Sequence, residues 1–129
     1  MAIILLINAE NISYLFLPKY EYYLDEATGS YVIDINGVLY KHISEKEYES
    51  INDMLEKEGI YTNRATPVGR INLYSTEKWR YRIYGNKNEE HRILLRGEDA
   101  YAFNDANYPE VYFCREDVLK LYRDSATAE

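Results

Sequence analysis

Apolar and polar residues alternate along much of the chain, and this period of two predicts β-strands. Residues 31–35 and 38–43 are two such runs, and the Asn36-Gly37 dipeptide between them is typical of a tight hairpin turn. The same reasoning predicts further strands and connections at residues 2–17, 70–74, 79–84, 92–95 and 111–114, with a turn at 25–30, a break at 67–69 and a loop at 104–109.

One segment has helical spacing instead. Tyr48, Ile51 and Leu55 recur at intervals of three and four, which places them on one face of a helix over about residues 45–58. Ser44 and Glu47 form a capping box at its start, and Gly59 can close its end. A shorter helix is expected over about residues 115–124.

These elements predict an α+β fold, with a mostly antiparallel sheet of about five to seven strands and two helices. The length of 129 residues corresponds to one domain. We expect that domain to span residues 1–124, with residues 125–129 as a frayed tail.

Charge is unevenly distributed along this acidic chain, whose net charge is −7. Residues 1–63 hold four Lys and Arg against eleven Asp and Glu, residues 64–96 hold eight against three, and residues 97–129 hold three against eight. A basic middle therefore lies between two acidic parts. The acidic total disfavours general binding to double-stranded nucleic acid, which depends on neutralising phosphates.

The basic middle contains the stretch TEKWRYRIYGNK, in which cations and aromatic residues alternate. As a strand, it would place Lys78, Arg80 and Arg82 on one face and Trp79 and Tyr81 on the other. On the next expected strand, Arg92 and Arg96 share a face with Leu94 between them. Such a cluster of cations needs a nearby negative charge. The acidic segments of the chain, a phosphate-bearing ligand or an acidic face of a protein partner could each supply it.

The predicted helix has the opposite charge. Glu45, Glu49, Asp53 and Glu56 recur along the face away from its apolar residues. This stripe is either a solvated face or a surface that mimics a phosphate backbone and binds the nucleic-acid groove of a protein partner.

Motifs that would specify catalysis or a cofactor are missing from the sequence. It has no glycine-rich phosphate loop, no nucleophile elbow and no metal-ligand spacing of His and Cys, so neither a metal nor a cofactor is predicted. The single cysteine, Cys114, fits a reducing compartment and a cytoplasmic protein. The apolar start, residues 1–7, is too short to span a bilayer, and no membrane partner is expected.

The stretch LLINAENISYL, with Asn8-Ala9 followed by Ile12 and Leu15, resembles the opening of the small viral ring nucleases. That family counters type III CRISPR immunity by binding and cleaving cyclic oligoadenylate. The resemblance implies a catalytic role for His42, which precedes the helix, and ligand-binding roles for Asn8 and for Arg64 of the Asn63-Arg64 pair. The same half of the chain also resembles LytTR-type DNA-binding domains in its strand, hairpin and helix, so both readings stay open.

We therefore expect a non-catalytic, acidic binding protein, of the type by which a phage or mobile element inhibits a host defence system. Its partner would be a protein target. The alternative is a protein that sequesters, or through His42 slowly cleaves, a cyclic oligonucleotide or another phosphorylated signal molecule. The alternating charge of the segments also suggests a homodimer.

Overall fold

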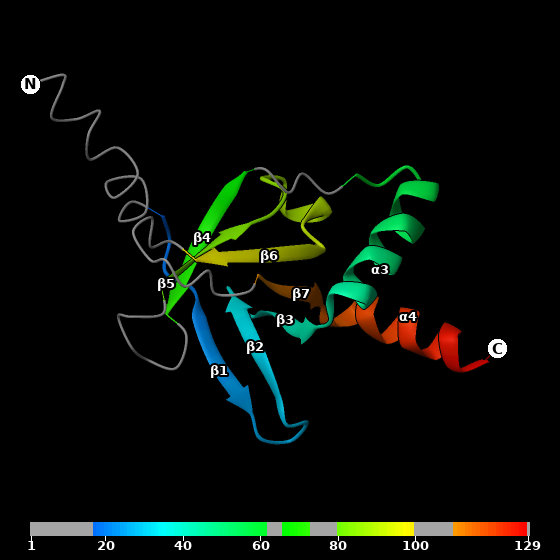
Figure 1. Cartoon of the computed structure of the whole chain (residues 1–129), viewed down its shortest axis with the longest axis horizontal. Helices are drawn as coiled ribbons and strands as arrows, with labels where there is room; N and C mark the ends of the chain where they lie inside the picture. The colour runs from blue at the N-terminus through cyan, green and yellow to red at the C-terminus, as the bar shows by residue number, and fades with distance from the viewer. Residues whose placement is uncertain (1–16, 62–65, 73–79, 100–109, 129) are drawn as a thin grey trace, which may run out of the picture.

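The computed structural model describes residues 17–61, 66–72, 80–99 and 110–128, and Figure 1 shows how their elements are arranged. The strands are β1 (Glu21–Asp25), β2 (Ser30–Ile35), β3 (Val38–Ile43), β4 (Pro67–Asn72), β5 (Arg80–Tyr84), β6 (Leu94–Asp99) and β7 (Val111–Arg115). The helices are α3 (Glu45–Lys57) and α4 (Glu116–Ala128), and η2 (Glu89–His91) is a short 3-10 turn.

The seven strands of the described residues form one sheet in the order β1-β2-β3-β7-β6-β5-β4, and every pairing between them is antiparallel. The predicted α+β class is confirmed. The sheet curls until its two edges approach each other. There the Tyr20 amide donates to the Arg70 carbonyl at 2.8 Å, and the Arg70 amide donates to the Pro18 carbonyl at 2.9 Å.

The turn between β2 and β3 is the hairpin that the sequence predicts. Asn36 and Gly37 both have left-handed backbone angles, with φ of 53° and 88°. Asn and Gly tolerate this conformation best, and the pair gives the twist that an antiparallel hairpin needs. The Asp34 carboxylate also accepts a hydrogen bond from the Gly37 amide at 2.7 Å. The turn is thus held in one geometry at the rim of the sheet.

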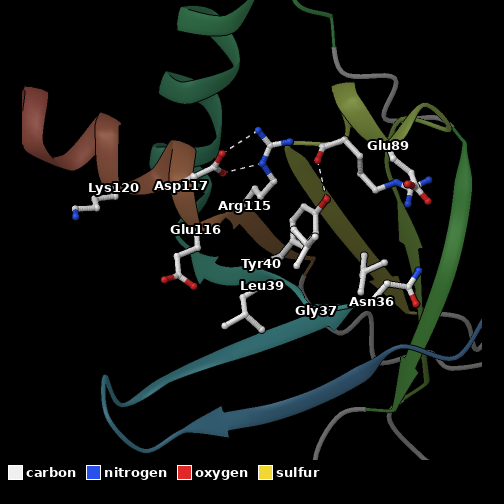
Figure 2. Close-up of a pocket in the computed structure, with 12 residues that line it drawn as sticks. Asn36, Gly37, Leu39, Tyr40, Glu89, Arg115, Glu116, Asp117 and Lys120 are labelled. Atoms are coloured by element: carbon white, nitrogen blue, oxygen red, sulfur yellow. Dashed lines mark hydrogen bonds and ion pairs between the residues drawn. The ribbon is translucent and has the colours of Figure 1, made fainter.

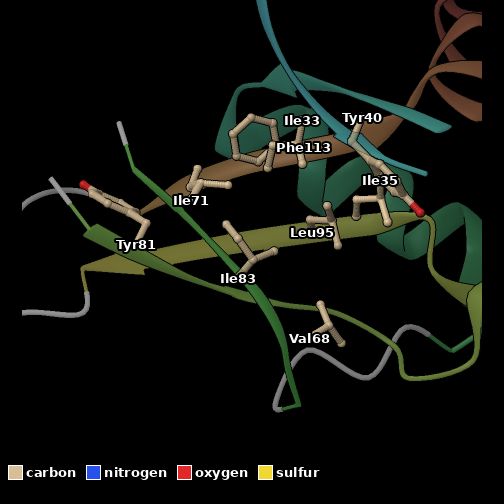
Figure 3. Close-up of a cluster of buried hydrophobic side chains, with 9 residues drawn as sticks. All are labelled: Ile33, Ile35, Tyr40, Val68, Ile71, Tyr81, Ile83, Leu95 and Phe113. Carbon is tan, nitrogen blue, oxygen red and sulfur yellow. The ribbon is translucent and has the colours of Figure 1, made fainter. Parts of the chain in front are cut away.

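Alternate residues of the strands point into the curl and form the first part of the core (Figure 3). This inner cluster consists of Ile33, Ile35, Tyr40, Val68, Ile71, Tyr81, Ile83, Leu95 and Phe113. Tyr81 and Ile83 pack there as the alternation predicts. Trp79, expected beside them, lies outside the described residues.

The two helices cover the other face of the sheet over β3 and β7 (Figure 1). Beneath them lies a second cluster, made of Ile43, Tyr48, Ile51, Leu55, Ile93, Leu94, Cys114 and Leu119. Helix α3 begins as predicted, with the Ser44 hydroxyl accepting from the Glu47 amide at 3.1 Å. The Arg123 guanidinium of α4 pairs with the Glu47 carboxylate at 3.2 Å and ties the helices together.

Several expected boundaries are wrong. Strand β1 was not predicted, because its two exposed apolar side chains, Tyr23 and Leu24, follow no clear alternation. Strand β4 begins at Pro67 rather than after it, since proline is tolerated at the first position of an edge strand. Strand β6 begins at Leu94, because Glu89–His91 forms the 3-10 turn.

The C-terminal helix also departs from the prediction. It continues to Ala128, beyond the expected end at 124 and into the segment that was expected to be a frayed tail; residue 129 lies outside the description. The segment from Ser125 contains two alanines and no glycine or proline, so nothing in it stops a helix. The expected strands at 2–16 and loop at 104–109 also lie outside the described residues.

Candidate functional site

A cavity of about 620 Å³ opens at the rim of the sheet, between the β2–β3 turn and the start of α4 (Figure 2). One wall is largely apolar and comes from β2 and β3, with Ile35, Val38, Leu39 and Tyr40. The facing wall is charged and comes from the joint between β7 and α4, with Arg115, Glu116, Asp117 and Lys120. We call this the helix-side cavity.

A second cavity of about 630 Å³ adjoins the first. The two share Ile35, Asn36, Gly37, Glu89 and Arg92. The remaining lining of this strand-side cavity comes from the meeting edges of the sheet, with Pro18, Lys19, Tyr20, Glu21 and Val68, and from β2, with Asp34. Arg92 therefore lies where the two cavities meet.

Arg92 is a buried cation, with only 8% of its surface exposed. Its Nε donates to the Asn86 carbonyl at 2.8 Å and its Nη2 donates to the Lys87 carbonyl at 3.1 Å. Both acceptors are uncharged. Within the described part of the chain, no carboxylate forms an ion pair with Arg92. A buried charge without a counterion is costly, so this guanidinium favours an anion beside it.

Arg115 is different, because the chain already supplies its counterion. Its Nε and Nη2 donate to the two carboxylate oxygens of Asp117 at 2.7 and 3.1 Å, a forked pair visible in Figure 2. These hydrogen bonds hold the pKa of Asp117 below its usual range. Asp117 also accepts from the Val118 amide at 2.9 Å. The Arg115–Asp117 pair thus forms a fixed, neutralised part of the wall.

Tyr40 connects the apolar wall to Arg92. Its hydroxyl donates to the Arg92 carbonyl at 2.7 Å. A dashed line at the labelled Tyr40 marks this bond in Figure 2. Burial raises the pKa of Tyr40 to about 12, although the positive charge of Arg92 acts in the opposite direction. The phenol is therefore neutral near pH 7 and serves as a donor that fixes the backbone at Arg92.

The structure corrects the predicted position of Arg92. We expected it on a strand face beside Arg96, but Arg92 follows the η2 turn and precedes β6. Its side chain reaches back to the carbonyls of residues 86 and 87 instead. The alternation of Arg92, Leu94 and Arg96 suggested one continuous strand, and the Asn88 cap of the η2 turn was the signal against it.

Arg82 of β5 and Arg96 of β6 lie on neighbouring strands, on the face away from Tyr81 and Ile83. Across the strands Arg82 lies between Arg70 and Glu98. Arg96 forms ion pairs with Glu98 at 3.3 Å and with Glu110 at 3.9 Å. For Arg96, the chain's own acidic residues supply the negative charge.

Arg96 also lies over the ring of Tyr84, with its guanidinium carbon 5.2 Å from the ring centre. Arg80 is the first residue of β5. Lys78, Arg64 and Asn8 lie outside the described residues.

The carboxylate stripe is present on α3, where Glu45, Glu49, Asp53 and Glu56 are all exposed. Glu56 accepts a hydrogen bond from the Asn52 amide group at 3.2 Å. This surface is separate from the two cavities, since none of its four residues lines either of them.

His42 lies at the other end of β3 and lines neither cavity. Its ring packs against the ring of Phe113 in a T-shaped arrangement, with 5.6 Å between the ring centroids and 79° between the ring planes. Burial lowers the pKa of His42, so the neutral imidazole is favoured. The contact with Phe113 is one of packing, and the residue remains exposed to solvent.

Sequence reasoning missed the residues at the joint of β7 and α4. Arg115, Asp117 and Lys120 belong to the stretch VYFCREDVLK, a strand followed directly by a helix. Charged residues at such a joint lie at the rim of a sheet. That position was the signal from which these cavity-lining residues could have been predicted. Cys114, one residue earlier, is fully buried, and burial raises the pKa of its thiol to about 12.

Within the ranges that the structure describes, no group of three or more His, Cys, Asp and Glu residues is arranged to hold a metal ion. None of the described helices has the length and apolar character needed to cross a membrane. In comparisons with known proteins, no protein family matches the chain, and neither a curated protein nor a solved structure does.

Proposed function

We propose that this protein binds a small anionic molecule at the two adjoining cavities, without catalysing its conversion. Phosphorylated signal molecules belong to this class of ligand. The observation that carries the proposal is Arg92, a buried guanidinium at the junction of the cavities with no carboxylate partner in the described chain.

The size and lining of the cavities support this proposal. Each has a volume within the range of about 300–1,000 Å³ that is common for small-molecule sites. The helix-side cavity combines an apolar wall with a few polar groups, as ligand sites usually do. His42 lies outside both cavities, and we therefore assign no cleavage step to it.

Mass spectrometry of small molecules released from the denatured, purified protein tests the proposal. We expect an anionic compound in an amount close to one per chain. The Arg92→Met variant should lose it, whereas Arg123→Met should keep it, because Arg123 is an exposed residue of α4 outside both cavities. Circular dichroism checks that both variants fold. A neutral compound, or full retention by folded Arg92→Met, would refute the proposal.

A second candidate function is binding to a basic surface of a protein, as an inhibitor of a host defence system would do. The exposed carboxylate stripe on α3 favours it. Replacing Glu45, Glu49, Asp53 and Glu56 by Gln should leave thermal stability nearly unchanged, because exposed charges contribute little to it. Association with a basic target should slow, as it should at high salt. Unchanged association of the variant would exclude the stripe as the binding surface.

A further inference from the structure

We infer that the ligand is an organic monoanion with an apolar body, such as a carboxylate, a sulfonate or a phosphodiester, rather than a doubly charged phosphate monoester. This inference rests on the proposed function and narrows its ligand class. Three features of the cavities lead to it: their balance of charges, the donors that Arg92 has left, and the apolar wall.

The balance of charges disfavours a dianion. Four cations and five carboxylates line the two cavities together. The cations are Lys19, Arg92, Arg115 and Lys120, and the carboxylates are Glu21, Asp34, Glu89, Glu116 and Asp117. The lining thus already has one more carboxylate than cations, so each negative charge that a ligand brings adds repulsion away from Arg92. A monoanion adds less of this repulsion than a dianion and can still pair with Arg92. Like charges in a partly buried site repel strongly.

The hydrogen-bond donors of Arg92 also favour a ligand with a single negative charge. Two of its three nitrogens, Nε and Nη2, already donate to backbone carbonyls. Nη1 has no hydrogen-bond partner among the described residues. Arg115, the other guanidinium at the cavities, is occupied by Asp117. The site therefore presents one buried guanidinium to the ligand instead of the several cations that usually surround a phosphate monoester.

The apolar wall accounts for the rest of the ligand. Ile35, Val38, Leu39 and Tyr40 stand beside Arg92 in the helix-side cavity. Val38, an apolar residue at the rim, leaves 44% of its surface exposed to solvent. A ring or alkyl body placed against this wall would remove apolar surface from water, which stabilises the complex. The charged group would then meet Arg92, and the body would extend toward Val38.

Four naphthalene compounds separate these features at about pH 8, where a phosphate monoester with a second pKa of about 6 is doubly charged. 8-Anilino-1-naphthalenesulfonate is a fluorescent monoanion, and N-phenyl-1-naphthylamine has the same rings without the charge. We expect one sulfonate probe per chain, and binding of the neutral amine weaker by about tenfold or more, because a charge-assisted hydrogen bond is lost. In competition, 1-naphthalenesulfonate should displace the probe about tenfold better than 1-naphthyl phosphate.

Variants assign the binding to the cavity. Arg92→Met should reduce affinity for the sulfonate probe to that for the neutral amine, while affinity for the amine stays unchanged. Val38→Trp, at an exposed position, should fill the helix-side cavity and weaken both probes. Arg123→Met serves as the matched control and should bind both probes like the unaltered protein.

The outcomes separate the inference from the proposed function. If 1-naphthyl phosphate displaced the probe as well as 1-naphthalenesulfonate or better, the preference for a monoanion would be refuted. The proposed anion site would still stand. No saturable binding of the sulfonate probe would overturn the apolar body, while an anionic compound retained by the purified protein would still support the function. Equal binding of both fluorescent probes, or unchanged sulfonate binding by Arg92→Met, would overturn the role of Arg92 and with it both proposals.

Discussion

Tyr20 and Gly69 lie where the two edges of the sheet meet. The Tyr20 hydroxyl donates to the Val68 carbonyl at 2.6 Å, and its ring lies against the backbone of Gly69. A side chain at residue 69 would overlap that ring. The absence of a Cβ at this residue therefore allows the edges to approach and the strand-side cavity to form.

Gly69→Ala should destabilise the protein by about 1–3 kcal/mol, because the new methyl group must displace the Tyr20 ring. Urea unfolding measures this cost. In a Tyr20→Ala background the same substitution should cost clearly less, since the clash is gone. An equal cost in both backgrounds would contradict the close packing of Tyr20 on Gly69.

Tyr40 makes a prediction about pH. Its pKa is about 12 in the folded protein against an ordinary value of 10.0, so its neutral form is favoured by folding. The stability that follows is fully present below pH 10 and is lost as pH rises from about 10 to about 12. We therefore expect Tyr40→Phe, measured by urea unfolding at about pH 8 and about pH 11, to lose less stability with rising pH than the unaltered protein. Equal losses would show that Tyr40 is not the responsible group.

Helix α3 depends on its first turn. The Ser44 hydroxyl caps the Glu47 amide, and Glu45 and Glu47 place negative charge at the positive end of the helix dipole. Ser44→Ala should cost about 1 kcal/mol of stability. Ser125→Ala, at an exposed position within α4, should change stability by less than about 0.5 kcal/mol. Thermal unfolding of the two variants compares them, and similar effects would contradict the capping role.

Elements that depend on local signals could be predicted from the sequence. The Asn36-Gly37 turn, strand β3 and helix α3 match their expected positions, because turn chemistry and caps act over a few residues. Strand β1 was missed because it is stabilised by pairing with β2 rather than by a pattern of its own. The position of Arg92 could not be predicted either, since it depends on carbonyls that the 85–91 segment turns toward it.

At the scale of the whole molecule, the candidate site depends on the curl of the sheet. Its lining comes from the approach to β1, the β2–β3 hairpin, the η2 turn and the start of α4, which are far apart in the sequence. They meet because β7, the last strand, pairs between β3 and β6 and carries α4 to the rim. Strand order is a long-range property, which explains why sequence patterns gave the elements but not the cavities.

The alternating charge of the segments concerns assembly. We expect a homodimer in which basic strands of one copy face acidic segments of the other. Raising the salt concentration should weaken it by screening these charges. Analytical ultracentrifugation at low and high salt measures the association. A monomer at every salt concentration and at tens of micromolar protein would contradict this expectation.

The most direct test of the central claim is an NMR titration of arginine side chains with 8-anilino-1-naphthalenesulfonate. The claim is that a bound anion compensates the buried charge of Arg92. The guanidinium signals of Arg92 should therefore shift in proportion to the occupied fraction of the site, while those of Arg123, paired with Glu47 away from both cavities, stay constant. Saturable binding that leaves the Arg92 signals unmoved would contradict the account.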